Sequence, residues 1–149
     1  MAKTVFFYDL ETSGLSARED RIMQFAGQRT DMDLKPIGDP INVLVALNDD
    51  TIPSPDALLV TGITPQKTRE EGYSEADFAK LVVEEWFTPD TIVVGFNSVR
   101  FDDEFIRHLL WRNFQDPYEW SWKDGRSRWD LLDVMRACYA LRPEGINWP

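Results

Sequence analysis

The sequence predicts an α/β fold in which an antiparallel meander of three strands and one parallel strand form a mixed sheet flanked by helices. Three β-favouring or alternating runs, at residues 4–10, 21–30 and 36–47, are separated by polar turns, which favours antiparallel pairing. A helical pattern at 74–87 then precedes a continuous apolar run at 91–96, which is typical of a buried central strand. A helix between strands implies layers of both kinds and mixed pairing.

The size and composition of the chain fit one folded domain. It has 149 residues, of which 43% are hydrophobic, enough for a sizeable core. No run approaches the roughly 18 apolar residues of a membrane span, and residues 1–3 lead straight into a strand rather than a signal peptide. Cys138 is the single cysteine, which excludes an internal disulfide, and its helical surroundings predict burial. We expect a cytoplasmic monomer without membrane contact.

The net charge of −10 argues against a nucleic-acid partner, because polyanions usually bind to basic faces. The charge is unevenly spread, however. Residues 1–97 hold 8 Lys/Arg and 17 Asp/Glu, a balance of −9, whereas residues 98–149 hold 8 and 9, a balance of −1. The acidity therefore weakens a nucleic-acid function without excluding it.

The first strand ends with two carboxylates. Asp9 and Glu11 are two residues apart, so their side chains are predicted to project side by side from one face. Such a pair is repulsive unless it is neutralised, and the usual neutraliser is a hard divalent cation such as Mg²⁺ or Mn²⁺. The alternative is a strand that simply ends in polar turn residues.

Two helices are predicted between the meander and the buried strand. A short one covers residues 55–60 with a proline in its first turn, and the glycine and proline of 61–65 end it. The second, at 74–87, begins with Ser74 as its cap and has apolar residues at intervals of three and four.

A further helix is predicted after the buried strand, with Asn97 or Ser98 as its cap. Acidic residues at 102–104 suit the start of a helix, which accounts for Asp103 and Glu104. Asp102 also lies near the C-terminal end of the buried strand, where α/β sheets usually place ligands. The core side of this helix is predicted to carry Phe101, Phe105 and Leu109, with Leu110 and Phe114 close to the same side.

These stretches resemble a known superfamily. Residues 9–14, Asp-Leu-Glu-Thr-Ser-Gly, resemble the first motif of the DEDD 3′→5′ exonucleases, and residues 97–102, Asn-Ser-Val-Arg-Phe-Asp, resemble the second. The Thr-Gly-Ile-Thr turn at 61–64 also recurs in that group. Residues 113–149 closely resemble the bacterial exodeoxyribonuclease I family, so the likeness covers essentially the whole chain. It implies a ribonuclease H-like fold.

The resemblance also implies a chemistry. In this superfamily four carboxylates hold two metal ions, which activate water and stabilise the charge on the phosphate and the leaving oxygen. By the motif match Asp9, Glu11 and Asp102 are three of the four, with Asp9 bridging the ions. Two Mg²⁺ ions are expected in a complete domain, and Mn²⁺ can substitute.

The third motif of the superfamily, His-x-x-x-x-Asp, is not found. His108 is the single histidine; Asn113 stands five residues on, and the predicted helix of the second motif contains both. His108 is therefore interpreted as a solvated or packed helix residue. We expect residues 1–149 to be an incomplete, C-terminally truncated exonuclease domain without the accessory domains of the family. Such a chain should be inactive or nearly so, and poorly soluble or partly unfolded on its own.

Aromatic and basic residues interleave in the last third of the sequence, a pattern typical of single-strand binding. The alternative is that these tryptophans belong to the core or a hinge, which is preferred for Trp129. The resemblance implies that the DNA strand contacts Arg107, Tyr118, Trp122 and Arg136. It places the terminal nucleotide over Glu11 and Thr12.

Two further acidic residues, Asp130 and Asp133, stand at helical spacing with Arg136 three residues further on. They could be mistaken for metal ligands. We interpret Asp130 as a helix cap and Asp133 as a member of a surface pair.

The predicted function is hydrolysis of single-stranded DNA to mononucleotides from the 3′ end, in DNA repair, by two-metal-ion chemistry. A single-stranded-DNA-binding protein could be a second partner, through the C-terminal part that this sequence lacks. Two alternatives stay open: a non-catalytic module that binds single-stranded nucleic acid, and an RNA-directed DEDD exonuclease.

Overall fold

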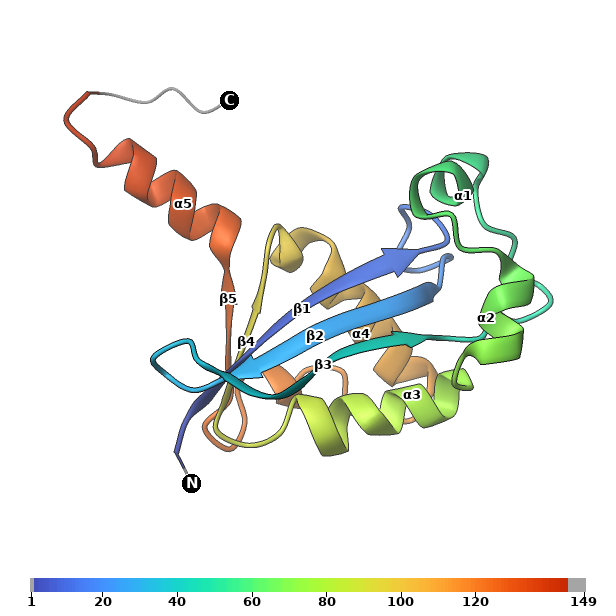
Figure 1. Ribbon diagram of the computed structural model, residues 1–149, viewed down its shortest axis with the longest axis horizontal. Helices are drawn as coiled ribbons and strands as arrows, with labels where there is room; N and C mark the ends of the chain where they lie inside the picture. The colour runs from blue at the N-terminus through green and yellow to red at the C-terminus, as the bar shows by residue number, and fades with distance from the viewer. Residues whose placement is uncertain (1, 145–149) are drawn as a thin grey trace.

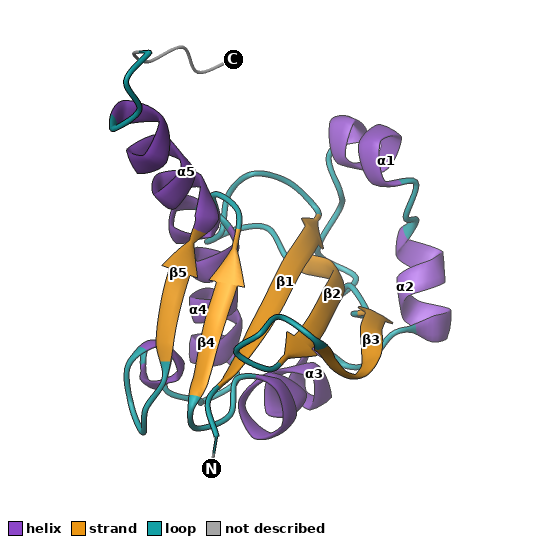
Figure 2. Ribbon diagram, turned by 60° about the vertical axis from the view of Figure 1, so that its left-hand side comes forward, coloured by secondary structure: helices purple, strands orange, loops and turns teal. Residues whose placement is uncertain are grey.

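A five-stranded mixed sheet forms the centre of the computed structural model, which describes residues 2–144 (Figures 1 and 2). The strands lie in the order β3-β2-β1-β4-β5. The three-strand meander is antiparallel, and β4 is parallel to β1, as the sequence predicts. The strands are β1 (Thr4–Thr12), β2 (Ile22–Thr30), β3 (Pro36–Leu44), β4 (Thr91–Gly95) and β5 (Ser127–Asp130).

Two features of the sheet differ from the prediction. β5 was not predicted, because its four residues contain a single apolar side chain; pairing with β4 makes it a strand. β3 ends at Leu44 rather than at residue 47. The amide of Val45 still donates to Met23, but the amide of Ala46 turns to the carbonyl of Tyr73. The chain therefore leaves β2 at this point.

The described part of the chain contains five α-helices. α2 was not predicted, because Pro65 reads as a helix breaker; proline is tolerated in a first turn, and Thr64 caps the helix. Ser74 caps α3 as predicted, and the expected helix 74–87 continues as a π-helical turn, Val82–Trp86. None of the described helices is long and apolar enough to cross a membrane. The helices are α1 (Pro55–Thr61), α2 (Pro65–Glu71), α3 (Glu75–Leu81), α4 (Asp102–Arg112) and α5 (Leu131–Ala140).

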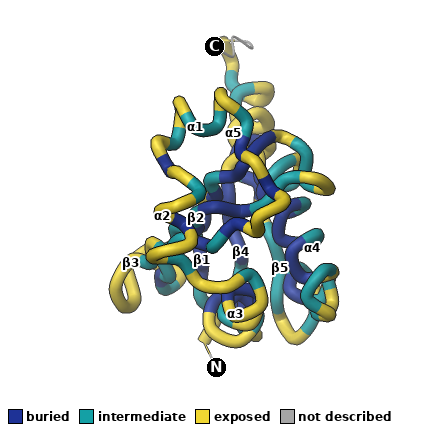
Figure 3. Tube along the Cα trace, turned by 90° about the vertical axis from the view of Figure 1, so that its right-hand side faces the viewer, coloured by how far each residue is buried: buried dark blue, intermediate teal, exposed yellow. Residues whose placement is uncertain are grey.

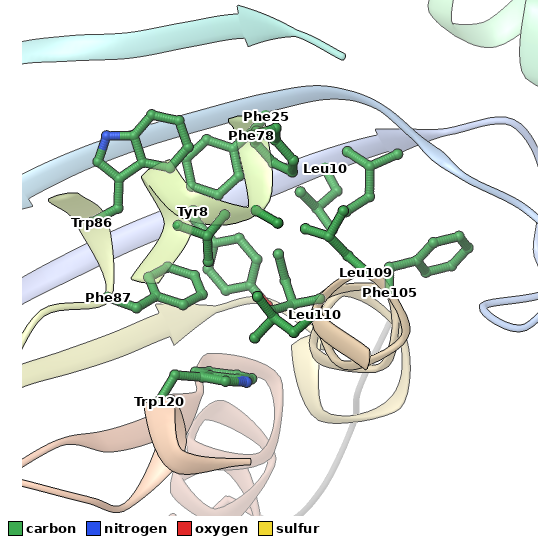
Figure 4. Packing of buried hydrophobic residues seen from close by; sticks show 14 of the residues in the cluster. Tyr8, Leu10, Phe25, Phe78, Trp86, Phe87, Phe105, Leu109, Leu110 and Trp120 are labelled. Carbon is green, nitrogen blue, oxygen red and sulfur yellow. The ribbon is translucent and has the colours of Figure 1, made fainter. Parts of the chain in front are cut away.

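The main core lies between the sheet and the helices α3 and α4, which both pack on one face (Figures 1 and 3). β1 alternates, so Phe6, Tyr8 and Leu10 all point into this core. Figure 4 shows the aromatic centre, in which the ring of Phe25 stacks on Trp86 with centroids 4.5 Å apart. α4 adds the buried side chains of Leu109 and Leu110 to this core.

The predictions for α4 hold in its middle and fail at its ends. Phe105, Leu109 and Leu110 are buried and Phe101 packs against them, but Phe114 is 99% exposed. Phe114 follows the end of the helix with φ of 59°, so it no longer keeps the helical register. Neither Asn97 nor Ser98 caps α4, because a 3₁₀ turn, Ser98–Arg100, separates them from the helix.

The predictions of burial near the C-terminal end are also wrong. Cys138 is exposed, and Trp129, predicted to be a core or hinge residue, is 54% exposed and is therefore not part of the core. α5 continues from β5 away from the sheet (Figure 1), and only Leu132 in it is buried. The expectations that concerned residues 145–149 lie outside the described residues.

A buried polar network connects three elements on the core face. Asp103 of α4 is 1% exposed; it accepts hydrogen bonds from the hydroxyl of Tyr8 at 2.6 Å and from Nη1 of Arg128 at 2.8 Å. Burial, and then the charge of Asp103, raise the pKa of Tyr8 well above its usual value. The sequence suggested only a helix-start role for Asp103, because its partners are 95 and 25 residues away. The network ties β1, α4 and the edge strand β5 together.

Replacing Asp103 by alanine is expected to lower the free energy of unfolding by about 3 kcal/mol, because it leaves Arg128 without its buried carboxylate. Tyr8→Phe removes one hydrogen bond to the same carboxylate and should cost about 1 kcal/mol. Urea denaturation of the two variants and the parent measures both values.

The matched control is Asp133→Ala, which removes a carboxylate that pairs with Arg100 and Arg136 at the surface. Its cost should stay within about 0.5 kcal/mol. Equal losses for Asp103→Ala and Asp133→Ala would contradict a stabilising role of the buried network.

Candidate active site

The carboxylates of β1 lie on the face of the strand opposite the core. Tyr8 and Leu10 point inward, so Asp9 and Glu11 point the other way; Asp9 is exposed and Glu11 half-buried. The predicted side-by-side arrangement is therefore present in the strand. Partial burial, and then the negative charge of Asp9, raise the pKa of Glu11.

Asp102 brings a third carboxylate to the same strand from α4. It is the first residue of the helix, only 5% of it is exposed, and its Oδ1 accepts a hydrogen bond from the Leu10 amide at 3.2 Å. Burial, and then the charge of Asp9, raise the pKa of Asp102 to about 7. The charge of Asp9 thus acts on both Glu11 and Asp102.

The position of Asp102 depends on the loop between β4 and α4. Asp130 is buried, and its carboxylate accepts hydrogen bonds from the amides of Asn97, at 2.8 Å, and Val99, at 3.2 Å. Asn97 adopts a left-handed φ of 57° here. Gly95 is required by close approach, because a Cβ would lie 2.5 Å from that of Ser98. The same Asp130 also caps α5, as predicted, by accepting from the Leu132 amide.

The loop after β1 is held by its own hydrogen bonds. The hydroxyl of Thr12 donates to the carbonyl of Gly14 at 2.7 Å, and that of Ser13 donates to Asp20 at 2.9 Å. Gly14 packs so closely that a Cβ would lie 2.4 Å from the Asp20 carboxylate. The amide of Ser54 donates to the Ser13 carbonyl, which fixes the start of α1 beside this loop.

A pocket of about 260 Å³ lies between this loop and α1, next to the carboxylates. Glu11 and Thr12, over which the terminal nucleotide is predicted to lie, are among its lining residues. No sequence signal pointed to its apolar walls, because they come from separate elements. These walls are formed by Leu15, Val60 and Phe101.

The predicted DNA-contacting residues are distributed over two regions. On one side the guanidinium of Arg107 lies 5.1 Å from the ring centre of Tyr118 and also pairs with Glu104. Tyr118 and Trp122 are both exposed, whereas the neighbouring Trp120 is a core residue. Arg136 lies on α5, where it pairs with Asp133 at 3.9 Å, as predicted for a surface pair. His108 is half-buried on α4, in line with its interpretation as a packed helix residue.

Within residues 2–144, no group of three or more His, Cys, Asp or Glu side chains stands in an arrangement ready to hold a metal ion. The donor set at the end of β1 nevertheless has the chemistry that hard cations prefer: three carboxylates, one of them buried and electrostatically strained by another.

Comparisons with known proteins show which family the chain belongs to. A protein-family model described as Exonuclease matches residues 6–148. Exodeoxyribonuclease I of Haemophilus influenzae is 54% identical over 143 residues, which are 96% of this chain and 30% of that protein. The Escherichia coli protein of the same name is 53% identical over 146 residues, 98% of this chain and 31% of that one. The similarity lies in their N-terminal part, so the chain spans less than a third of the length of these relatives.

Solved structures give the same result. One described as the zinc-ion-bound form of an E. coli ExoI–ssDNA complex matches with a TM-score of 0.93 and 52% identity, over 100% of this chain and 32% of that one. An ExoI/SSB-Ct complex matches with the same TM-score, identity and coverage. The mixed sheet and its helices are thus a ribonuclease H-like exonuclease fold, and the chain belongs to the exonuclease family.

Proposed function

We propose that the chain carries the metal-dependent active site of an exonuclease that hydrolyses single-stranded DNA to mononucleotides from the 3′ end. The observation that supports this best is the electrostatic strain at the end of β1, where Asp9 raises the pKa of both Glu11 and Asp102. Carboxylates that repel one another destabilise a fold unless a cation neutralises them. In a member of the exonuclease family, that cation is a catalytic one.

The residues that would hold the metal are Asp9, Glu11 and Asp102, and an all-oxygen donor set favours Mg²⁺, with Mn²⁺ as a substitute. When bound, such ions supply Lewis acidity for the attack of water on the scissile phosphate. Asp102 accepts the Leu10 amide through Oδ1, which orients its carboxylate toward the end of β1. The charge of Asp9 raises the pKa of both Glu11 and Asp102, and Asp9 is therefore the proposed bridging ligand.

The pocket beside Glu11 is the proposed site of the 3′-terminal nucleoside. Its floor is the hydrogen-bonded loop after β1, and its apolar walls, Leu15, Val60 and Phe101, suit the faces of a base. Leu15 and Val60 are both largely exposed in the chain as described, so a base would cover apolar surface. An unpaired end enters such a pocket more readily than a base pair, which favours single strands.

The strand leading to that nucleoside is proposed to contact Arg107, Tyr118, Trp122 and Arg136. Exposed aromatic rings beside guanidinium groups combine base stacking with phosphate pairing. The ExoI/SSB-Ct complex supports a single-stranded-DNA-binding protein as a second partner of the whole protein. We propose that the whole exonuclease acts in the cytoplasm as a monomer.

Asp9→Ala is expected to reduce the release of nucleotides from 5′-labelled single-stranded DNA in Mg²⁺ by roughly 100-fold or more, because the bridging ligand is lost. Gel analysis of the complete product of the gene that encodes this sequence measures the rate and the polarity. Asp33→Asn, which changes an exposed carboxylate in the turn between β2 and β3, is the control and should keep the parent rate.

Three results would overturn the proposal in different ways. Full activity of Asp9→Ala would refute the metal assignment. Tight binding of DNA without hydrolysis in Mg²⁺ or Mn²⁺ would favour a non-catalytic binding module. Faster digestion of RNA than of DNA of the same sequence would indicate an RNA-directed exonuclease.

The pKa of Asp102 predicts a pH-dependent stability in the absence of metal. Its pKa is about 7 in the folded chain and near 3.8 in an unfolded one, so the folded chain binds its proton more tightly. The tighter binding of this proton stabilises the folded chain fully below pH 4, and the stabilisation is lost as the pH rises to about 7. Asp102→Asn has no such charge to bury and should therefore melt at a higher temperature than the parent at pH 8.

Thermal melts in EDTA at pH 4 and pH 8 measure this difference, which should be on the order of 4 kcal/mol at pH 8 and vanish toward pH 4. Added Mg²⁺ should stabilise the parent and leave Asp102→Asn nearly unchanged. Asp33→Asn, at an exposed position, serves again as the control. A variant that melts below the parent at pH 8 would show that the Asp102 carboxylate is not under strain.

A further inference from the structure

A second cleft, of about 620 Å³, runs along the C-terminal half of α4, beyond the carboxylates. It is bounded by that helix, by the loop between β1 and β2, and by the segment that follows α4. Two of its residues, Arg107 and Tyr118, already belong to the proposed DNA path. The others that matter here are Arg18, His108, Trp111 and Arg112.

The cleft is basic in a chain whose net charge is −10. Its lining holds three arginines and one acidic residue, Glu104, which pairs with Arg107. Arg18 is exposed and has no hydrogen bond or ion pair within the described part of the chain. A guanidinium that is not neutralised by the protein is available to an anion that enters from solvent.

Arg112 also contributes to the positive charge of the cleft. Glu75 binds it through two hydrogen bonds, at 3.0 and 3.2 Å, but the same carboxylate also lies 3.8 Å from Nε of Arg21. One carboxylate thus serves two guanidinium groups. Nη1 of Arg112 and Nε of Arg107 are buried and have no hydrogen-bond partner among residues 2–144. The region therefore keeps an excess of positive charge and of donors.

Trp111 gives the cleft an aromatic surface. It is 70% exposed on a helix whose opposite side is in the core, and Tyr118 across the cleft is 58% exposed. The two rings thus present aromatic faces to solvent within one cleft, where a base could stack on them. Arginines that alternate with exposed aromatic faces are the combination that binds single-stranded nucleic acid without regard to sequence.

Asp102 begins α4 and Trp111 lies near its end. Nine residues separate them, which corresponds to roughly 13 Å along the axis and about two and a half turns, so the two side chains lie on opposite sides of the helix. A strand whose terminal nucleoside lies beside Glu11 would therefore pass around α4, by way of Arg107, and reach Trp111 a few nucleotides upstream.

We propose that Arg18 and Trp111 form an upstream subsite for the single-stranded substrate, where Trp111 stacks on a base and Arg18 pairs with a phosphate. The inference rests on the proposed function and extends it, since it predicts that productive binding needs unpaired nucleotides well behind the 3′ end. Arg107 and Tyr118 line the same cleft, and Arg112 adds positive charge to it.

The test measures binding of 5′-fluorescein oligothymidylates of two and eight nucleotides to the complete gene product by fluorescence anisotropy in EDTA, which prevents metal-dependent hydrolysis. Trp111→Ala should weaken binding of the eight-nucleotide strand roughly 5- to 100-fold, and Trp111→Phe should restore most of it. Arg18→Ala should weaken it less and lower the slope of log Kd against log salt by about 0.7, the value for one phosphate contact on a single strand. Neither variant should change binding of the dinucleotide.

Matched controls remove the same kinds of side chain at the far end of the sheet. Lys35→Ala removes an exposed positive charge, and Met32→Ala an exposed apolar side chain, both in the turn between β2 and β3. Neither should alter the Kd or the salt slope.

The outcomes separate this inference from the proposed function. If the parent binds the eight-nucleotide strand and Arg18→Ala and Trp111→Ala behave like the two controls, the subsite is refuted and the active site stands. An equal loss for the dinucleotide and the longer strand would also refute an upstream position. A parent that binds neither strand would overturn both proposals.

Discussion

The structure of the site depends on one unfavourable interaction, the repulsion between Asp9 and the buried carboxylate of Asp102. Burial alone opposes the charge of Asp102, and Asp9 increases that opposition. A fold can keep such a group only if neighbouring elements hold it firmly. The Leu10 amide holds Asp102 from the strand side, and Asp130 holds the loop that leads to it.

Negative and positive side chains near the site lie in two separate regions. Carboxylates gather at the end of β1, where a cation and a phosphate are proposed to meet. Guanidinium groups gather one to three turns further along α4, where only phosphates and bases would pass. The strongly acidic total therefore says little about the partner, because the local arrangement of charges matters at contact distance.

The sequence predicted the parts of the fold that local patterns encode. The alternation in β1 and β2, the apolar run of β4 and the cap of α3 are all local, and all are confirmed. β5 and the exposure of Trp129 could not be predicted, since a four-residue strand is defined by its neighbour β4 rather than by its own composition. The same limit applies to the site. Asp9 and Glu11 follow from the spacing in one strand, but the hydrogen bonds of Asp103 and Asp130 join residues far apart in the chain.

The network of Asp103, Tyr8 and Arg128 has a consequence for motion. Asp103 is the neighbour of Asp102 in the first turn of α4, and Arg128 is in the edge strand β5. An opening of β5 would break the ion pair and loosen the helix turn that presents the buried carboxylate. Hydrogen exchange should then report the amides of β5 and of the first α4 turn as one cooperative unit, so that fraying at the edge of the sheet would also loosen the proposed active site.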